Sequence, residues 1–325
     1  MKSRFRSMFA VALAMTVPLA GALAQAYPTR PVKFVVGFPP GGPGDTSTRI
    51  MADALSKALG QQFVVENKTG AAGNLAVESV ARAAPDGYTL LSGNSGALAV
   101  NPSLYPSLPF DAAKDFTPIT MMVLSPMVFF IRTESPVKSL PELVALMKSR
   151  GAELNYGTPG AGTLPHLAVE ALKLRLKLQS THVPYRGTGP MMDGVLKGEV
   201  QWAMDAPVGP IGQAKAGKVR ILAVAARERW PTLPDVPTVK ETGVPGIEEA
   251  YAWFALMGPA GLPKDIVARL YEPAVAALRD PQLKERMVNV GLAPTPMTPE
   301  QTAAFMDKER TLWGAVVREN NIKLE

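Results

Sequence analysis

Cysteine is absent from this chain of 325 residues, and histidine occurs only twice, at His166 and His182. The lack of cysteine excludes disulfide bonds, thiolate zinc sites, iron–sulfur clusters, a cysteine nucleophile and a lipid-bearing cysteine anchor. Two histidines are too few for a histidine-rich metal site, so the sequence predicts no metal and no cofactor. Hydrophobic residues make up 47% of the chain and charged residues 19%, which is typical of globular proteins.

Apolar runs long enough to span a membrane are also missing, since no window after residue 26 has 18 apolar residues in a row. Residues 1–26 have the pattern of a secretory signal peptide. Basic residues precede an apolar stretch at 8–20, and a small-x-small cleavage site ends at Ala26. A transmembrane anchor is the alternative, but the stretch is short and is interrupted by Pro18 and Gly21. We therefore expect export across the inner membrane, cleavage near Ala26 and a periplasmic mature protein.

The net charge of +6 raises the question of a nucleic-acid partner. Removal of residues 1–26 takes away three positive charges and no negative ones, which leaves 31 basic against 28 acidic residues. The remaining basic residues are scattered, as at Arg227 and Arg229, whereas a nucleic-acid binder needs a clustered basic patch. We expect no nucleic-acid partner.

The length favours about two domains, and short β-rich runs alternate with helical patterns, which is typical of α/β folds with mostly parallel sheets. The predicted domains are residues 27–104 plus 226–325 and residues 105–225, after the signal peptide at 1–26. Strands are expected at 32–38, 63–65, 88–91, 121–131, 154–156, 182–185, 200–204, 219–225 and 251–257. Helices are expected near 46–59, 75–84, 139–149, 164–176, 191–197, 264–279, 281–290 and 299–320.

Three of the apolar strands end in loops rich in Gly, Pro, Ser and Thr, at 38–45, 92–96 and 157–163, and each loop precedes a helix. Open α/β sheets bind ligands at the carboxyl ends of their strands. Glycine lets backbone N–H groups approach a ligand, and the helix that follows offers unpaired donors that suit an anion. Ordinary βα turns are the alternative. We favour a carboxylate held between two domains.

Nucleotide-binding motifs fail at the decisive positions. A phosphate-binding loop needs lysine after its second glycine, but Pro43 follows Gly42 here. The dinucleotide fingerprint breaks in the same way, because the pair Gly160 and Gly162 runs into Pro165.

A secreted hydrolase built on Ser95 is the enzymatic alternative. The string around Ser95 is close to a nucleophile elbow, but Ala97 stands where the last glycine belongs. His166 and Asp205 would complete a triad in the order Ser, His, Asp, which is not the order of α/β-hydrolases. We expect no enzymatic activity.

Four charged or titratable residues and one aromatic pair have two interpretations each. Asp45 lines the cleft or caps the helix that starts beside it. His166 donates to a carboxylate or is simply packed, while Arg186 clamps a carboxylate through its fork of donors or forms an ion pair. Asp205 accepts from a ligand amino group or hydroxyl, or makes a structural hydrogen bond to the next helix turn. For Trp253 and Phe254, ordinary core is favoured over a cleft wall.

Short motifs follow one another in order from Tyr27 towards the C-terminus. They are Tyr27-Pro28-x-Arg30-Pro31, Phe38-Pro39-Pro40-Gly41-Gly42-x-x-Asp45, Val64-Val65-Glu66-Asn67, Gly70-Ala71-x-Gly73-Asn74, Pro85-Asp86-Gly87-Tyr88, Asn101-Pro102-x-Leu104-Tyr105, Asp115-Phe116-x-Pro118, His182-Val183-Pro184-Tyr185-Arg186-Gly187 and Leu233-Pro234-Asp235-Val236-Pro237-Thr238. The ordered set resembles the Bug-type proteins, which are extracytoplasmic solute receptors of tripartite tricarboxylate transporters.

The resemblance implies a two-domain periplasmic binding protein of the Venus-flytrap type, with two crossing strands and a small carboxylate or amino-acid-like ligand in the cleft. It implies delivery of the ligand to membrane permease subunits. Sequence does not separate this role from that of a ligand sensor for a membrane kinase. We expect a monomer, because flytrap receptors are usually monomeric and no heptad stripe is present.

Carried onto this sequence, the resemblance implies ligand contacts from loops of both domains. In the first domain these are Phe38, Pro40, Gly41, Gly42 and Asp45, with Gly93, Asn94 and Ser95 beside them. In the second domain they are Thr158, Gly160, Gly162 and Thr163. His166, Arg186 and Asp205 complete the candidate site.

Overall fold

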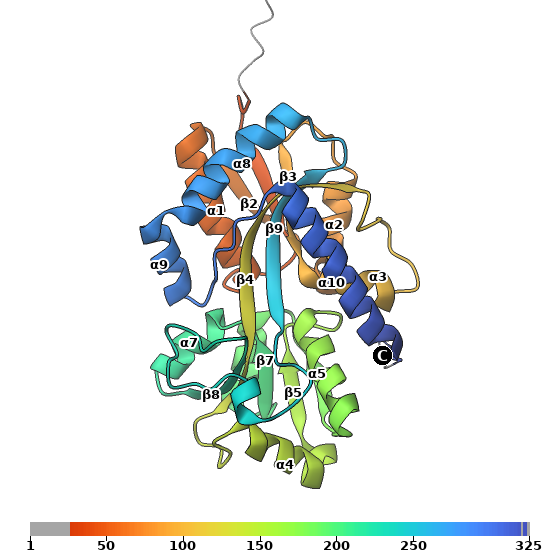
Figure 1. Ribbon diagram of the computed structural model, residues 1–325, viewed down its shortest axis with the longest axis vertical. Helices are drawn as coiled ribbons and strands as arrows, with labels where there is room; N and C mark the ends of the chain where they lie inside the picture. Colours follow the sequence, from red (N-terminus) through yellow and green to blue (C-terminus); the bar gives the residue numbers. More distant parts are fainter. Residues whose placement is uncertain (1–26, 320, 324–325) are drawn as a thin grey trace, which may run out of the picture.

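The computed structural model describes residues 27–319 and 321–323, which form two α/β lobes stacked end to end (Figure 1). The predicted signal peptide lies outside the described residues. Within those residues, no helix combines the length and apolar character that a membrane span requires. The strands and helices alternate as the sequence predicts, and the α/β class is confirmed.

The first lobe is built on a mixed sheet in which β1 (Val32–Val36) pairs in parallel with β2 (Phe63–Asn67) and β3 (Thr89–Asn94). Next to β3 lies β9 (Tyr251–Pro259), antiparallel to it, and then β4 (Phe116–Arg132). The helices of this lobe are α1 (Pro43–Leu59), α2 (Asn74–Ala81), α3 (Asn101–Leu104), α8 (Lys264–Arg279), α9 (Pro281–Asn289) and α10 (Pro299–Glu319).

The second lobe has a parallel centre formed by β6 (Thr181–Pro184), β5 (Asn155–Thr158) and β7 (Trp202–Asp205). The last residues of β4, 127–132, pair antiparallel with β7 and with β8 (Val219–Ala225). The helices here are α4 (Leu140–Arg150), α5 (Leu164–Leu176), α6 (Thr188–Lys197) and α7 (Val208–Lys215). Sequence patterns missed α7, which is short and holds Pro210 and two glycines.

Two strands cross between the lobes, as Figure 1 shows along the centre of the molecule. β4 pairs with β9 over residues 116–126 and with β7 and β8 over residues 127–132, so one strand of 17 residues belongs to both sheets. The chain returns to the first lobe through β9. The two crossing strands that the family resemblance implies are therefore present.

The segment 226–250 packs with the second lobe, although the sequence analysis assigns it to the first domain. Trp230 is buried in the same apolar cluster as Val224 on β8, and the Val224 N–H donates to the Pro237 carbonyl. The Ala250 N–H donates to Ala225 just before β9 begins. We propose domain boundaries at the crossing points, near 126 in β4 and 250 before β9.

Several element ends differ from the sequence prediction. Gly42, rather than Asp45 or Thr46, is the N-cap of α1, because Pro43 at the first helical position fixes the start. The sequence predicts a helix from residue 191, but α6 begins at Thr188, with Gly187 as its N-cap. The second glycine-rich segment is expected to be a loop from residue 92, but β3 continues to residue 94.

Candidate functional site

The carboxyl ends of the parallel strands in the two lobes face each other across a central cleft. The loops after β1, β3, β5, β6 and β7 all contribute to one inner cavity with an empty volume of about 470 Å³. The cavity is lined by Phe38, Pro39, Gly42, Pro43, Asn94, Ser95, Gly96, Pro159, Thr163, Leu164, Pro165, Thr188, Asp205, Ala252 and Phe254. The loops that begin at Phe38 and at Thr158 therefore meet at the same site, as the sequence predicts.

The first turns of three helices point at this inner cavity. Gly42 and Pro43 belong to the start of α1, Thr163 to Pro165 to the start of α5, and Thr188 is the first residue of α6. The first four N–H groups of a helix have no partner within it, and the helix dipole places positive charge there. The arrangement therefore favours an anion, which backbone groups from both lobes can hold.

An outer cavity adjoins the inner one and shares Phe38, Pro39 and Pro159 with it. It is larger, with an empty volume of about 1250 Å³, and is lined by residues 69–73 and 159–161 of the glycine-rich loops. Arg186 belongs to this outer cavity and not to the inner one.

The two lobes touch around the cleft through glycines. A methyl group placed on Gly42 would lie 3.2 Å from Thr188 Oγ1 of the other lobe, and one on Gly96 would lie 3.1 Å from the Gly162 carbonyl oxygen. At Gly187 the same methyl group would lie 2.5 Å from Pro39 Cγ. The cleft is closed in this structure, and the closeness of the backbones depends on these residues having no side chain.

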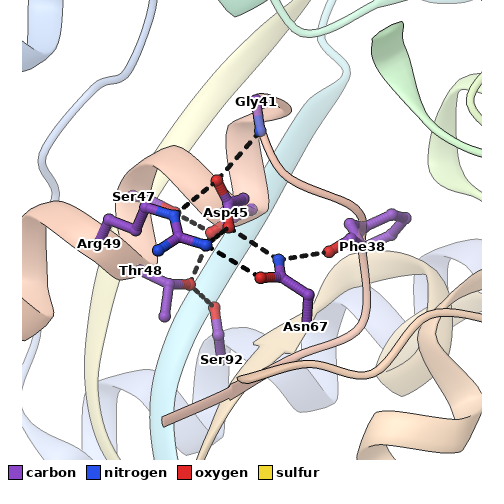
Figure 2. Close-up of polar contacts among 9 residues, drawn as sticks. Phe38, Gly41, Asp45, Ser47, Thr48, Arg49, Asn67 and Ser92 are labelled. Atoms are coloured by element: carbon purple, nitrogen blue, oxygen red, sulfur yellow. Dashed lines mark hydrogen bonds and ion pairs between the residues drawn. The ribbon is translucent and has the colours of Figure 1, made fainter. Parts of the chain in front are cut away.

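Asp45 fixes the loop that carries Phe38 (Figure 2). Its carboxylate accepts from the Gly41 N–H at 3.0 Å, from Arg49 Nε at 3.0 Å and from Asn67 Nδ2 at 2.7 Å. Asn67 Nδ2 also donates to the Phe38 carbonyl at 2.8 Å. Burial raises the pKa of Asp45, but the hydrogen bonds from Arg49, Asn67 and Gly41 together hold that pKa below its usual range. Asp45 supports the binding loop as a carboxylate and does not line either cavity.

We expect replacement of Asp45 by alanine to weaken ligand binding about tenfold and to destabilise the fold. Three donors lose their acceptor, and each unsatisfied group costs about 1–3 kcal/mol where it stays buried. Calorimetric titration with a carboxylate that the wild type binds measures the affinity of each variant. Asp53→Ala is the matched control, since Asp53 is an exposed residue of the same helix, paired with Lys57. Equal affinities of the two variants would contradict the role of Asp45.

Asn94 ends β3 at the inner cavity and is nearly buried, with 2% of its surface exposed. Its Oδ1 accepts from the Ala97 N–H at 2.9 Å. Its Nδ2 has no hydrogen-bond partner among the residues that the structure describes. The backbone therefore orients the side chain, and its Nδ2 is buried next to Gly73. Gly93, one residue earlier, packs against Met257 and Leu98 and lines neither cavity.

Asp205 lies at the inner end of the cleft with 2% of its surface exposed. Oδ2 accepts from Thr188 Oγ1 at 2.7 Å, and Oδ1 accepts from the Ala206 N–H at 2.8 Å. Burial raises the pKa of Asp205 to about 7, although the hydrogen bonds from Thr188 and Ala206 act in the opposite direction. Because Thr188 is the first residue of α6, this carboxyl group lies beside the N-terminal end of that helix.

The raised pKa of Asp205 predicts a pH dependence of stability. Between an ordinary value of about 4 and the folded value of about 7, the folded state holds a proton that the unfolded state releases. This contribution to stability is complete below pH 4 and is lost as the pH rises towards 7. We expect the free energy of unfolding of Asp205→Asn to rise relative to that of the wild type by on the order of 1 kcal/mol per pH unit across this window. Urea unfolding of both proteins at pH 5 and pH 8 measures the difference, and a constant difference would contradict the prediction.

His166 lies on the far side of the loop after β5, away from both cleft cavities. Its Nδ1 accepts from the Gly162 N–H at 3.2 Å, and its ring stacks on His182 with centroids 4.1 Å apart. His182 Nε2 pairs with Thr158 Oγ1 at 2.7 Å. Burial, with His166 and Lys173 nearby, lowers the pKa of His182 to about 3, so the ring is neutral. No hydrogen bond joins His166 to Ser95 or Asp205 in the described residues, and a hydrolytic triad is not assembled.

The structure brings together part of the predicted set. Phe38, Gly42, Asn94, Ser95, Thr163 and Asp205 line the inner cavity, and Gly160 and Arg186 line the outer one. Pro40, Gly41, Asp45, Gly93, Thr158, Gly162 and His166 line neither. Some of these support the loops instead.

Sequence analysis missed Thr188, Leu164, Pro165 and Ala252, and it favoured core for Phe254, which lines the inner cavity. A signal for Thr188 was available, because Gly187-Thr188 follows a strand and starts a helix just as the three recognised loops do. For Leu164 and Pro165, the sequence pattern predicts the start of a helix, but it does not indicate that the first turn of that helix faces the cleft.

Comparisons with known proteins agree on one family. The model of the family described as tripartite tricarboxylate transporter family receptor matches residues 47–322. The chain is similar to protein BugT of Bordetella pertussis, with 34% identity over 324 residues that cover 99% of both chains.

Solved structures show the same fold. Rpa4515 of R. palustris, solved with adipate, has a TM-score of 0.88 and 34% identity, covering 91% of this chain and 99% of that one. MatC (Rpa3494) from Rhodopseudomonas palustris, solved with bound malate, has a TM-score of 0.84 and 35% identity, covering 90% of this chain and 100% of that one. The two-domain binding-protein fold is confirmed.

Proposed function

Because the chain belongs to the tripartite tricarboxylate transporter family of receptors, we propose that it binds a small organic carboxylate between its lobes and releases it unchanged. The observation that carries this proposal is the convergence of the first turns of α1 and α5, one from each lobe, on the inner cavity. Adipate and malate, the ligands of two similar structures, are both carboxylates. Ligand release without chemistry agrees with the position of His166, which lies outside both cavities and contacts Gly162 and His182 instead.

The cellular role that fits this binding is transport. The predicted signal peptide at residues 1–26 supports a periplasmic location. There a monomeric receptor delivers its ligand to the membrane permease subunits of a tripartite tricarboxylate-type transporter. Capture by the closed cleft and release on opening is the conformational change that such delivery needs.

Thermal unfolding with added carboxylates tests the proposal. At a hundredfold excess over Kd, a ligand that binds the folded state stabilises it by about 2.7 kcal/mol, so a clear rise in Tm is expected. NMR of the recovered ligand then shows whether it is unchanged. Conversion of the ligand, abolished by Ser95→Ala, would establish a hydrolase instead.

A further inference from the structure

The described residues that line the inner cavity do not offer the positive charge that a second carboxylate group on a ligand would need. Among the described residues that line it, none is Lys, Arg or His, and Asp205 is the one ionisable side chain. Arg186 lies in the outer cavity. Above the pKa of about 7 that burial gives Asp205, a carboxylate placed beside it would therefore face a like charge without a cation to offset it.

Asp205 has the capacity to accept a hydrogen bond from a ligand. A carboxylate offers about four acceptor positions, and the protein fills two of them, from Thr188 Oγ1 and the Ala206 N–H. The side chain is buried and lines the cavity, so its remaining acceptor positions have little access to bulk water. A hydroxyl or ammonium group on a ligand would satisfy them.

The rest of the inner cavity is mostly apolar. Phe38, Leu164 and Phe254 form its walls together with several prolines, which suits an alkyl or aromatic body. The first turns of α1 and α5 are the place for one negative charge, since Asp205 already lies beside the start of α6 through its hydrogen bond from Thr188 Oγ1.

Resting on the proposed function, we propose that Asp205 determines the ligand class. The cleft binds an apolar monocarboxylate whose far end carries a hydrogen-bond donor, and Asp205 accepts from that donor and rejects a second carboxylate. The ligands of the similar structures, adipate and malate, each carry two carboxylates.

Two matched series of acids test the inference by calorimetric titration. The alkyl series is hexanoate, 6-hydroxyhexanoate and adipate, and the aromatic series is benzoate, 4-hydroxybenzoate and terephthalate. In the series that fits the cavity, we expect the wild type to bind the hydroxy acid at least about tenfold more tightly than the diacid. The wild-type ranking needs no variant and so does not depend on how a variant folds.

Asp205→Asn keeps the side-chain shape and removes the negative charge, so we expect the preference for the hydroxy acid over the diacid to fall to about threefold or less. Asp193→Asn, an exposed residue on the same helix as Thr188, is the control and should keep the wild-type preference. Tight binding of the diacid by the wild type, or an unchanged preference in Asp205→Asn, overturns the inference and leaves the proposed function in place. Failure of all six acids to bind contradicts the proposed function itself.

Discussion

Replacing Gly96 by valine is expected to weaken carboxylate binding by about tenfold to a hundredfold. Gly96 follows Ser95 at the cleft, and a methyl group there would already lie 3.1 Å from the Gly162 carbonyl oxygen and 3.4 Å from Thr163 Cα. Both neighbours are backbone atoms of the other lobe, so the two further methyl groups of valine require the lobes to separate. Overpacking of this kind costs about 1–3 kcal/mol, and that cost falls on the closed state.

The controls separate closure from folding. Gly212→Val adds the same side chain to a helix position where nothing lies within 4 Å, and its affinity should match the wild type. Gly96→Ala should give a smaller loss than Gly96→Val, in proportion to its size. Small-angle scattering should show that ligand compacts the wild type but not Gly96→Val. Wild-type affinity for Gly96→Val, with an unchanged Tm, would show that closure does not bring these backbones together.

The loops of the site could be predicted from sequence because the signal is local. A strand, a run of glycine and hydroxyl residues, and a helix follow one another at 38–45 and 157–163, and parallel strands place such loops at one edge of a sheet. Predicted and observed helix ends agree best where the helix signal in the sequence is strong. In α5, the observed start at Leu164 and end at Leu176 are those that the sequence predicts.

What could not be predicted depends on contacts between distant residues. Asp205 accepts from Thr188, 17 positions earlier, and the register of β4 against β9, which brings the lobes together, contains two bulges that no sequence pattern marks. His166 was assigned to the cleft because it follows Thr163 on a helix whose start lies there. Its ring turns to His182 instead, on a strand that pairs with β5.

Trp202 connects the core of the second lobe to the binding loop. Its ring is fully buried and stacks against Tyr156 at 5.0 Å between centroids and near Phe129 at 6.0 Å. Tyr156 stacks in turn on His182 at 4.9 Å, and His182 holds Thr158 at the start of the loop. The row of rings thus supports the backbone that carries Pro159 and Gly160 to the cleft.

We expect Trp202→Ala to lower the free energy of unfolding by about 3–5 kcal/mol, because the lost ring leaves a cavity within packed aromatic neighbours. Urea unfolding measures the change in stability. The affinity of the variant for a carboxylate that the wild type binds should also fall, because His182 loses its support. Trp202→Phe retains an aromatic ring and should lose less than half as much stability. Leu174→Ala is the control in the same lobe. Because Leu174 is 46% exposed, its replacement should lower the free energy of unfolding by less than about 1 kcal/mol. Equal losses for Trp202→Ala and Leu174→Ala would show that the stack does not hold the lobe together.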